Sequence, residues 1–184
     1  MRLNSKRAAM EMSVGTMVTI VLLMIVLVLG IFFIQKIFKS ATGAVDLTDE
    51  QLRNEINKLF GEDKELVIYP GTRRVEIKQE EIDGVGIGIK NLLEGVSGTQ
   101  EFSYEVVVSD ASDCVESESE IEEWFTTGRA ESNIPIAIGK SATQKVLFRI
   151  PSGTSLCTAR FRVNVDVGEE PYATDFFDIT VKAK

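Results

Sequence analysis

The sequence contains no histidine among its 184 residues. This absence removes the side chain that most often acts as a general base near neutral pH and most often binds metal ions. Ser-His-Asp and Cys-His catalysis are both excluded. Carboxylates are plentiful, but no two of them stand out as the acid and base of a glycosidase-like pair. We therefore expect a protein that is not an enzyme and that carries no cofactor.

Charged side chains are absent from a long stretch near the N-terminus, Met12 to Gln35, and the part from Met17 to Ile34 is almost entirely apolar. About 20 helical residues span the hydrocarbon core of a membrane, whereas a cleaved signal has an apolar core of only about 7–15 residues. We expect a retained transmembrane helix over residues 12–38. The alternative is cleavage at the small residues Ala41-Thr42-Gly43.

Basic residues bracket this stretch and indicate its orientation. Three precede it and two follow it, namely Arg2, Lys6, Arg7, Lys36 and Lys39. The positive-inside rule then favours a cytoplasmic tail over residues 1–11 and an extracytoplasmic C-terminal domain. The expected location is the cell membrane, with lipid as the partner of the helix.

The segment KRAAMEMSVGTMVTIVLLMIVLVLG, which begins at Lys6, resembles the N-terminus of type IV pilin-like proteins, especially archaeal pilins and archaellins. The resemblance implies a short basic leader that ends at Ala8 and is cut before Ala9. It also implies a homo-oligomer, a filament whose apolar helices bundle in the core while β-rich heads face outward. The sequence departs from bacterial pilins at Ser13, where they place a glutamate, and Glu11 lies two positions too early.

Acidic residues dominate the rest of the chain. Residues 40–184 contain 15 basic and 27 acidic side chains, a net charge of −12. Such a domain repels phosphate backbones, so we expect no nucleic-acid partner. It would also be held away from an anionic lipid surface.

A short amphipathic helix is predicted within residues 39–61, between the membrane segment and the main domain. Thr48 and Gln51 suit the N-cap and N3 positions of a capping box, and Gly61 suits the C-terminal cap. Leu47 and Leu52 suit a hydrophobic staple. An apolar stripe at helical spacing comprises Leu52, Ile56, Leu59 and Phe60. We expect this stripe to pack on the following domain, the alternative being that it pairs with other subunits.

From Glu65 onward the apolar residues recur at every second position, which is typical of half-buried strands. The C-terminal part shows it most clearly, with one face made by Cys157, Ala159, Phe161, Val163, Val165 and Val167. About eight such runs occur, at 65–69, 73–78, 84–90, 101–108, 133–138, 145–150, 157–167 and 175–184. The pattern predicts that residues 62–184 form an antiparallel β-sandwich, with an immunoglobulin-like topology as the first choice.

The two cysteines, Cys114 and Cys157, are expected to pair because the domain meets an oxidising compartment. Two buried free thiols are the alternative. The order Cys114, Trp124, Cys157 resembles that of immunoglobulin domains, but Ser155 stands where those domains have a tyrosine. Because Cys114 lies in an acidic loop, we expect the bridge to tie that loop to the strand beginning at Cys157.

Three further segments are candidate sites. Residues 110–123 carry seven carboxylates without the Asp-x-Asp-x-Asp-Gly spacing of a Ca²⁺ loop, so a solvated loop is favoured over a Ca²⁺ site. Trp124 and Phe125, with Ile121 at helical spacing, suit a helical turn that covers the core rather than a ligand-stacking site. The segment DGVGIGIKN predicts a strand with one bare face. Either the glycines are simply tolerated because this face is at the surface, or the face docks a neighbouring element or subunit. The bare positions are Gly84, Gly86 and Gly88.

These observations lead to two hypotheses for function. The first is a single-pass membrane-anchored cell-surface protein whose β-sandwich makes structural or adhesive interactions with a protein ligand that the sequence does not identify. The second is a type IV pilin-like filament subunit that polymerises through its N-terminal apolar helix. The mature N-terminus distinguishes them, since only the second predicts a start at Ala9.

Overall fold

The computed structural model describes residues 5–39, 44, 47–95 and 97–184. The side chains of residues 5–14 and 34–39 lie outside this description, as does the small-residue segment 41–43. The chain divides into two compact units, Met1–Ala41 and Thr42–Lys184.

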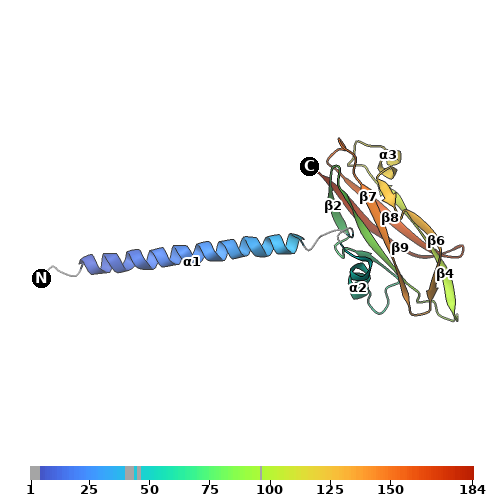
Figure 1. Ribbon diagram of the computed structural model, residues 1–184, viewed down its shortest axis with the longest axis horizontal. Helices are drawn as coiled ribbons and strands as arrows, with labels where there is room; N and C mark the ends of the chain where they lie inside the picture. Colours follow the sequence, from blue (N-terminus) through green and yellow to red (C-terminus); the bar gives the residue numbers. More distant parts are fainter. Residues whose placement is uncertain (1–4, 40–43, 45–46, 96) are drawn as a thin grey trace. The chain divides into compact units, whose positions relative to one another are not determined.

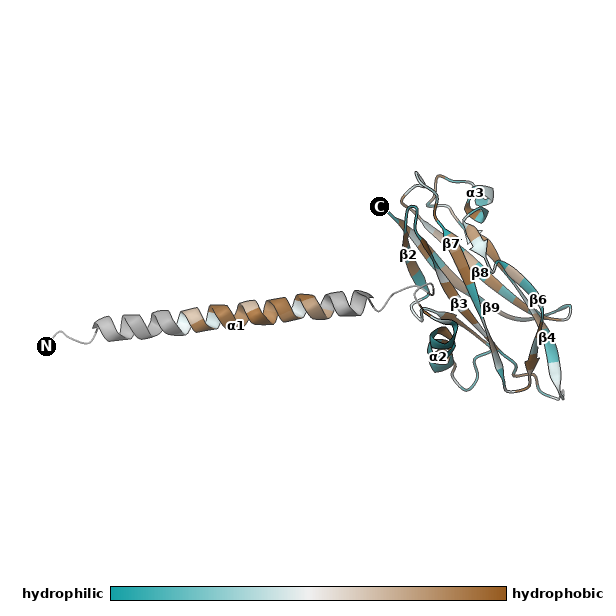
Figure 2. Ribbon diagram, viewed as in Figure 1, coloured by the Kyte–Doolittle hydropathy of each residue, from teal (hydrophilic) through white to brown (hydrophobic). Residues whose placement is uncertain are grey.

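The first unit is built on one helix, α1 (Ser5–Lys39). Its segment Gly15–Phe33 is, by length and composition, apolar enough to cross a membrane, and Figure 2 shows the apolar residues along the middle of the helix. Every described side chain of this segment is exposed on all sides of the helix. An apolar helix of this kind is normally buried either in a protein core or in a membrane. Because no face of this segment is buried within the protein, it has the properties expected of a membrane segment.

The second unit begins with α2 (Asp49–Leu59). Thr48 and Gln51 form the predicted capping box, in which the Thr48 amide donates to Gln51 Oε1 over 3.0 Å and the Gln51 amide donates to Thr48 Oγ1 over 3.3 Å. The prediction for Gly61 was wrong. Phe60 ends the helix with an extended backbone, and Gly61 is not in the left-handed region. Termination therefore does not use the glycine cap that the sequence suggested.

The strands form two packed sheets, with α3 (Glu118–Glu122) and the C-terminus at one end and α2 toward the other (Figure 1). One sheet has the order β1-β3-β7-β5, and the other β2-β9-β8-β4-β6. The first sheet contains β1 (Leu66–Tyr69), β3 (Ile82–Lys90), β5 (Phe125–Thr127) and β7 (Ser141–Arg149). The second contains β2 (Arg74–Lys78), β4 (Thr99–Asp110), β6 (Ala130–Ala137), β8 (Thr158–Val167) and β9 (Glu170–Lys182). All eight predicted strands are present.

The core lies between the sheets and is filled by the residues that alternate along each strand. The predicted inner face of β8 is buried from Ala159 through Val165, and its outer neighbours Arg160 and Arg162 are exposed. Four aromatic rings pack together with neighbouring centroids 4.7–5.9 Å apart. They are the buried Phe148, Phe161 and Phe177 and the partly buried Phe125. Burial of these rings supplies much of the hydrophobic free energy that holds the two sheets together.

The sandwich is immunoglobulin-like. The orders β1-β3-β7-β5 and β9-β8-β4 correspond to the ABED and GFC sheets of that fold, with β6 added beside β4. One pairing departs from the prediction, because β2 runs parallel to β9 whereas the other strand pairs are antiparallel. The chain leaves the first sheet after Tyr69 and joins the second at Arg74. Alternation predicts which residues face the core, but it does not predict the direction of the neighbouring strand.

Candidate interaction surfaces

The glycine face of β3 is occupied by α2 of the same chain. A Cβ atom placed on Gly86 would lie 2.6 Å from Leu52 Cδ1, and one on Gly88 would collide with Ile56. Leu52 and Ile56 are buried, so the predicted helical stripe packs on the domain. Gly84 has a different reason to be glycine, since its Cβ would collide with the backbone carbonyl of Val146 on β7. The bare positions Gly86 and Gly88 thus admit α2 of the same chain.

Polar contacts fix the two ends of α2 against β7. Lys145 donates a hydrogen bond to the Leu47 carbonyl over 3.1 Å, and its Nζ lies 3.3 Å from the Asp49 carboxylate. At the other end, Ser141 donates to Asn57 Oδ1 over 3.3 Å. The Asp49 side chain is 99% exposed, so its ion pair with Lys145 contributes little to stability, and the hydrogen bond to the Leu47 carbonyl is the contact that positions Lys145.

The two cysteines form the predicted disulfide at the end of the sandwich where α3 lies. Cys114 and Cys157 have Cα atoms 5.0 Å apart, a normal separation for a disulfide. The bridge ties the loop after β4 to the residue that precedes β8, as predicted. Two apolar side chains flank the disulfide on the surface: Val115 is 90% exposed and Leu156 is 64% exposed. We name this end of the domain, residues 110–123 with Leu156, the acidic tip.

Four of the seven carboxylates of the acidic tip have local partners. Glu116 accepts hydrogen bonds from the Ser155 amide and hydroxyl, at 2.6 and 2.5 Å. Burial raises the pKa of Glu116, but these bonds outweigh the effect and leave its pKa below the ordinary value. Bonds from Ser112 lower the pKa of Asp110, and bonds from Ser117 lower that of Glu120. Glu122 pairs with Arg129 over 2.8 Å.

The side chains of the other three carboxylates of the tip are exposed to solvent. In the described part of the chain, the exposed side chains of Asp113, Glu118 and Glu123 form no hydrogen bond or ion pair. Glu116 also lies near the two cysteine sulfurs, but both sulfurs are engaged in the disulfide. The acidic residues therefore form a charged, solvent-exposed surface.

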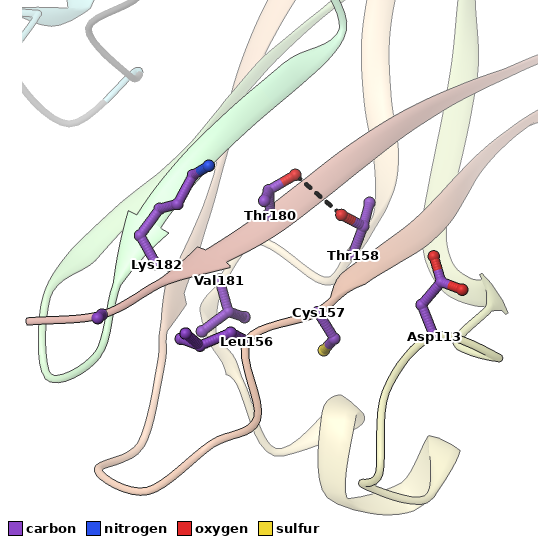
Figure 3. Close-up of a pocket in the computed structure, with 8 residues that line it drawn as sticks. Asp113, Leu156, Cys157, Thr158, Thr180, Val181 and Lys182 are labelled. Carbon is purple, nitrogen blue, oxygen red and sulfur yellow. Dashed lines mark hydrogen bonds between the residues drawn. The ribbon is translucent and has the colours of Figure 1, made fainter.

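An open depression of about 490 Å³ lies beside the disulfide (Figure 3). Asp113 and Leu156 line it, together with Thr158 and Thr180, whose hydroxyls are 3.1 Å apart. Lys182 also lines it and pairs with Glu76 over 3.2 Å. The two threonine hydroxyls thus bond to each other, and Lys182 pairs with a residue of the adjacent strand β2. The depression is a shallow surface feature whose one free carboxylate, Asp113, belongs to the acidic tip.

Trp124 covers the core as predicted, but its surroundings differ from the prediction. Ile121 is buried within α3, and Trp124 follows it with 1% of its surface exposed. Phe125, however, belongs to β5 and not to the helical turn. Its ring packs against Phe148, and Arg129 lies over it at 5.5 Å.

One feature that sequence reasoning did not single out lies on the outer face of the second sheet. Phe176 of β9 is 41% exposed and is the register partner of Arg162 on β8. Arg162 is in turn the register partner of Val107 on β4. We name these three residues the central row. Alternation indicated that they point outward, but only the register shows that they lie side by side.

The neighbouring row of the same face is charged. Arg160 donates to both carboxylate oxygens of Asp178, at 2.8 and 3.3 Å, and these bonds raise the pKa of the guanidinium. Arg74 lies 3.8 Å from the same carboxylate. Arg162 differs from both, because in the described part of the chain its exposed side chain forms no ion pair.

Comparisons with known proteins do not assign the chain to a family. No family model matches the chain, and no curated protein matches its sequence. Among solved structures, the chain is similar to the CARDB domain of a Pyrococcus furiosus protein, determined in complex with di-metal ions. The identity is 12%, the TM-score is 0.42, and the match covers 67% of this chain and 93% of that one.

Two further structures are similar over part of their length. A family 123 glycoside hydrolase from Clostridium perfringens is 10% identical with a TM-score of 0.37, covering 64% of this chain and 26% of that one. The alkylpurine DNA glycosylase AlkC from Pseudomonas fluorescens is 14% identical with a TM-score of 0.30, covering 62% and 29%. These proteins are much longer than the matched part, and we transfer neither activity to this chain.

The N-terminal site residues of the sequence analysis lie in α1. Ala8 and Ala9 fall within Ser5–Lys39. Leader cleavage between them was not tested and stays a prediction.

Proposed function

We propose that this protein is a single-pass membrane-anchored cell-surface protein whose β-sandwich makes structural or adhesive interactions. The observation that carries the proposal is the apolar segment Gly15–Phe33, whose side chains are all exposed within its own unit. Such a surface is stable in lipid, where the helix satisfies its own backbone hydrogen bonds. The disulfide supports an extracytoplasmic place for the domain.

Membrane fractionation tests the anchor. We expect the chain to remain in the membrane pellet after alkaline carbonate washing and to enter solution only with detergent. Protease added to intact cells should remove the sandwich and leave a short fragment that contains α1. A chain that is recovered in the soluble fraction with an N-terminus near Ala44 would contradict the proposal and leave a secreted β protein.

The second candidate is a filament subunit that polymerises through α1. It is supported by the resemblance of residues 6–30 to pilin-like N-termini and by the long helix that would remain after a cut before Ala9, since α1 extends to Lys39. Mass spectrometry of the mature chain separates the candidates. A start at Ala9 together with filaments in electron micrographs would support the polymer, whereas an intact N-terminus in a detergent-extracted monomer would support the anchor.

We also propose that the sandwich acts by binding and not by catalysis. In the described part of the chain, no buried side-chain oxygen or nitrogen lacks a hydrogen-bond partner, and the sequence contains no histidine. The function of the sandwich would therefore depend on the partner that its surface binds.

A further inference from the structure

The disulfide lies beside a carboxylate that completes a set of three possible metal ligands. The sulfur atoms of Cys114 and Cys157 and a carboxylate oxygen of Glu116 all lie within 4.8 Å of one another. Cys157 is buried, whereas Cys114 and Glu116 are half-buried. While the two sulfurs are bonded to each other, neither is a thiolate, which is the form of cysteine that binds a metal ion. Reduction of the disulfide therefore creates two ligands next to a third.

A second set of contacts joins the same two segments of chain without the disulfide. Glu116 accepts hydrogen bonds from the amide and hydroxyl of Ser155, which precedes Cys157 by two residues. The Ser155 hydroxyl in turn accepts a bond from the Val115 amide over 3.3 Å. Since Cys114 also lies two residues from Glu116, these bonds run beside the disulfide. We expect them to keep the two sulfurs near each other after the S–S bond opens.

The three ligands have the chemistry of a zinc site. Zn²⁺ binds cysteine sulfur at about 2.3 Å and carboxylate oxygen at about 2.0–2.2 Å, usually in a tetrahedral arrangement. Ca²⁺ and Mg²⁺ prefer oxygen ligands, whereas thiolates favour softer ions such as Zn²⁺. The bonds from Ser155 use only part of the acceptor capacity of Glu116, and carboxylates that bind metals are commonly hydrogen-bonded in this way.

The fourth position of the tetrahedron is left to a water molecule. Asp113 is the nearest candidate for a further protein ligand, because it lines the depression beside Cys157. In Figure 3, however, the Asp113 carboxylate and the Cys157 sulfur point in different directions. Asp113 instead adds to the negative charge of the acidic tip, which attracts a cation.

We propose that reduction of the disulfide converts this part of the acidic tip into a Zn²⁺ site whose protein ligands are Cys114, Cys157 and Glu116. The reductant is a thiol. Two thiol molecules supply two electrons and two protons, the S–S bond breaks, and the reductant leaves as its own disulfide. Zn²⁺ then displaces the protons of the two cysteine thiols, which pass to solvent. The metal thus replaces the disulfide as the link between the loop after β4 and the start of β8. This site goes beyond the proposed function, because it needs only the sandwich and not the anchor.

Zinc titration of the full chain in detergent, oxidised or reduced, tests the proposal. A water-soluble phosphine reduces the disulfide and takes up an oxygen atom from water, so no added thiol competes for the metal. We expect the reduced chain to bind one Zn²⁺ in competition with a chromophoric chelator, and the oxidised chain to bind about a hundredfold more weakly. Co²⁺ in place of Zn²⁺ should give thiolate-to-metal charge-transfer absorption only in the reduced chain. Equal affinity of the two chains, or no binding by the reduced chain, would overturn the proposal.

Variants of the carboxylate distinguish this site from binding by the two cysteines alone. Glu116→Gln should weaken Zn²⁺ binding by the reduced chain about tenfold or more, and Ser155→Ala, which removes the hydroxyl that orients Glu116, should weaken it about tenfold. The matched control is Glu118→Gln, the same change at an exposed carboxylate of the tip, which should leave the affinity unchanged. Wild-type affinity in Glu116→Gln, or an equal loss in Glu118→Gln, would contradict the assignment of Glu116.

Thermal unfolding shows whether the metal occupies a folded site. An ion that binds only the native state stabilises it, so Zn²⁺ should raise the Tm of the reduced chain, followed by the fluorescence of Trp124, and leave that of the oxidised chain unchanged. If the reduced chain unfolds without metal, Zn²⁺ should restore the native fluorescence. A reduced chain whose unfolding does not respond to Zn²⁺ would overturn the proposal.

Discussion

At the scale of single residues, the glycines of β3 illustrate how a missing side chain can be a structural requirement. Gly88 lies beneath Ile56, Phe60 and Val67, which fill the space that a Cβ atom would need. Gly61, by contrast, has no atom closer than 4.0 Å to the position of a Cβ, and its backbone is not in the left-handed region. The same substitution at the two positions should therefore have very different effects.

We predict that Gly88→Ala lowers the free energy of unfolding by about 1–3 kcal/mol because the added methyl group overpacks the contact with α2. The change is measured by chemical denaturation of the full chain in detergent, followed by the fluorescence of Trp124, the single tryptophan. Gly61→Ala is the control and should stay within about 0.5 kcal/mol. Adding Ile56→Ala to Gly88→Ala should cost less than the sum of the single changes, and strict additivity would argue against the contact.

The ionisation of Glu116 makes the stability of the domain depend on pH in the acid range. Its folded-state pKa lies below the ordinary value of 4.5, so ionised Glu116 stabilises the folded state above that pH. This contribution is lost as pH falls from 4.5 through the lower folded-state pKa. We predict that wild type and Glu116→Gln differ in unfolding free energy at pH 6 and converge in acid. A difference that stays constant with pH would show that the charge of Glu116 has no part in its contact with Ser155.

At the scale of elements, α2 and β3 show how far the sequence could be interpreted. The helical stripe and the bare strand face were each predictable from their periodicities. Their contact was not, because periodicity indicates that a face is covered without indicating what covers it. The strand β5 was missed since three residues are too few for alternation to be visible. The central row needed the register of three strands, which no local pattern of residues encodes.

The N-terminal cap of α2 yields a prediction for this element. Thr48→Ala should lower the free energy of unfolding by about 1 kcal/mol, because the Gln51 amide loses its acceptor. Gln51→Ala removes only the reciprocal bond to the Thr48 amide and should have a smaller effect. Denaturation curves of the two variants give the comparison, and a larger loss for Gln51→Ala would contradict the assigned capping roles.

At the scale of the whole molecule, the loop that the disulfide closes includes much of the sandwich. The 43-residue separation of Cys114 and Cys157 encloses α3 and three strands of the two sheets. A cross-link across such a long loop restricts the unfolded chain strongly. The bridge, and the loop and strand that it joins, were predictable from the compartment, the cysteine count and the strand pattern. The exposure of Val115 and Leu156 beside it required the structure.

We predict that Cys114→Ser/Cys157→Ser lowers the free energy of unfolding by about 2–5 kcal/mol. The reduced wild type, measured in excess dithiol, should match the double variant, and the double variant, which has no cysteine, should be unaffected by the dithiol. Equal stability of oxidised and reduced wild type would contradict a stabilising role for the bridge.

The packing of α2 against the glycines of β3 also affects how the domain would respond to a pulling force. In the proposed anchored protein, a load on α1 would enter the sandwich through α2, and the side-chain contacts of α2 with β3 would resist it before any ladder of strand hydrogen bonds. Those contacts can part and re-form without breaking a sheet. Each helical residue drawn out straight adds about 2 Å of reach, so the tether can lengthen under tension while the domain stays intact.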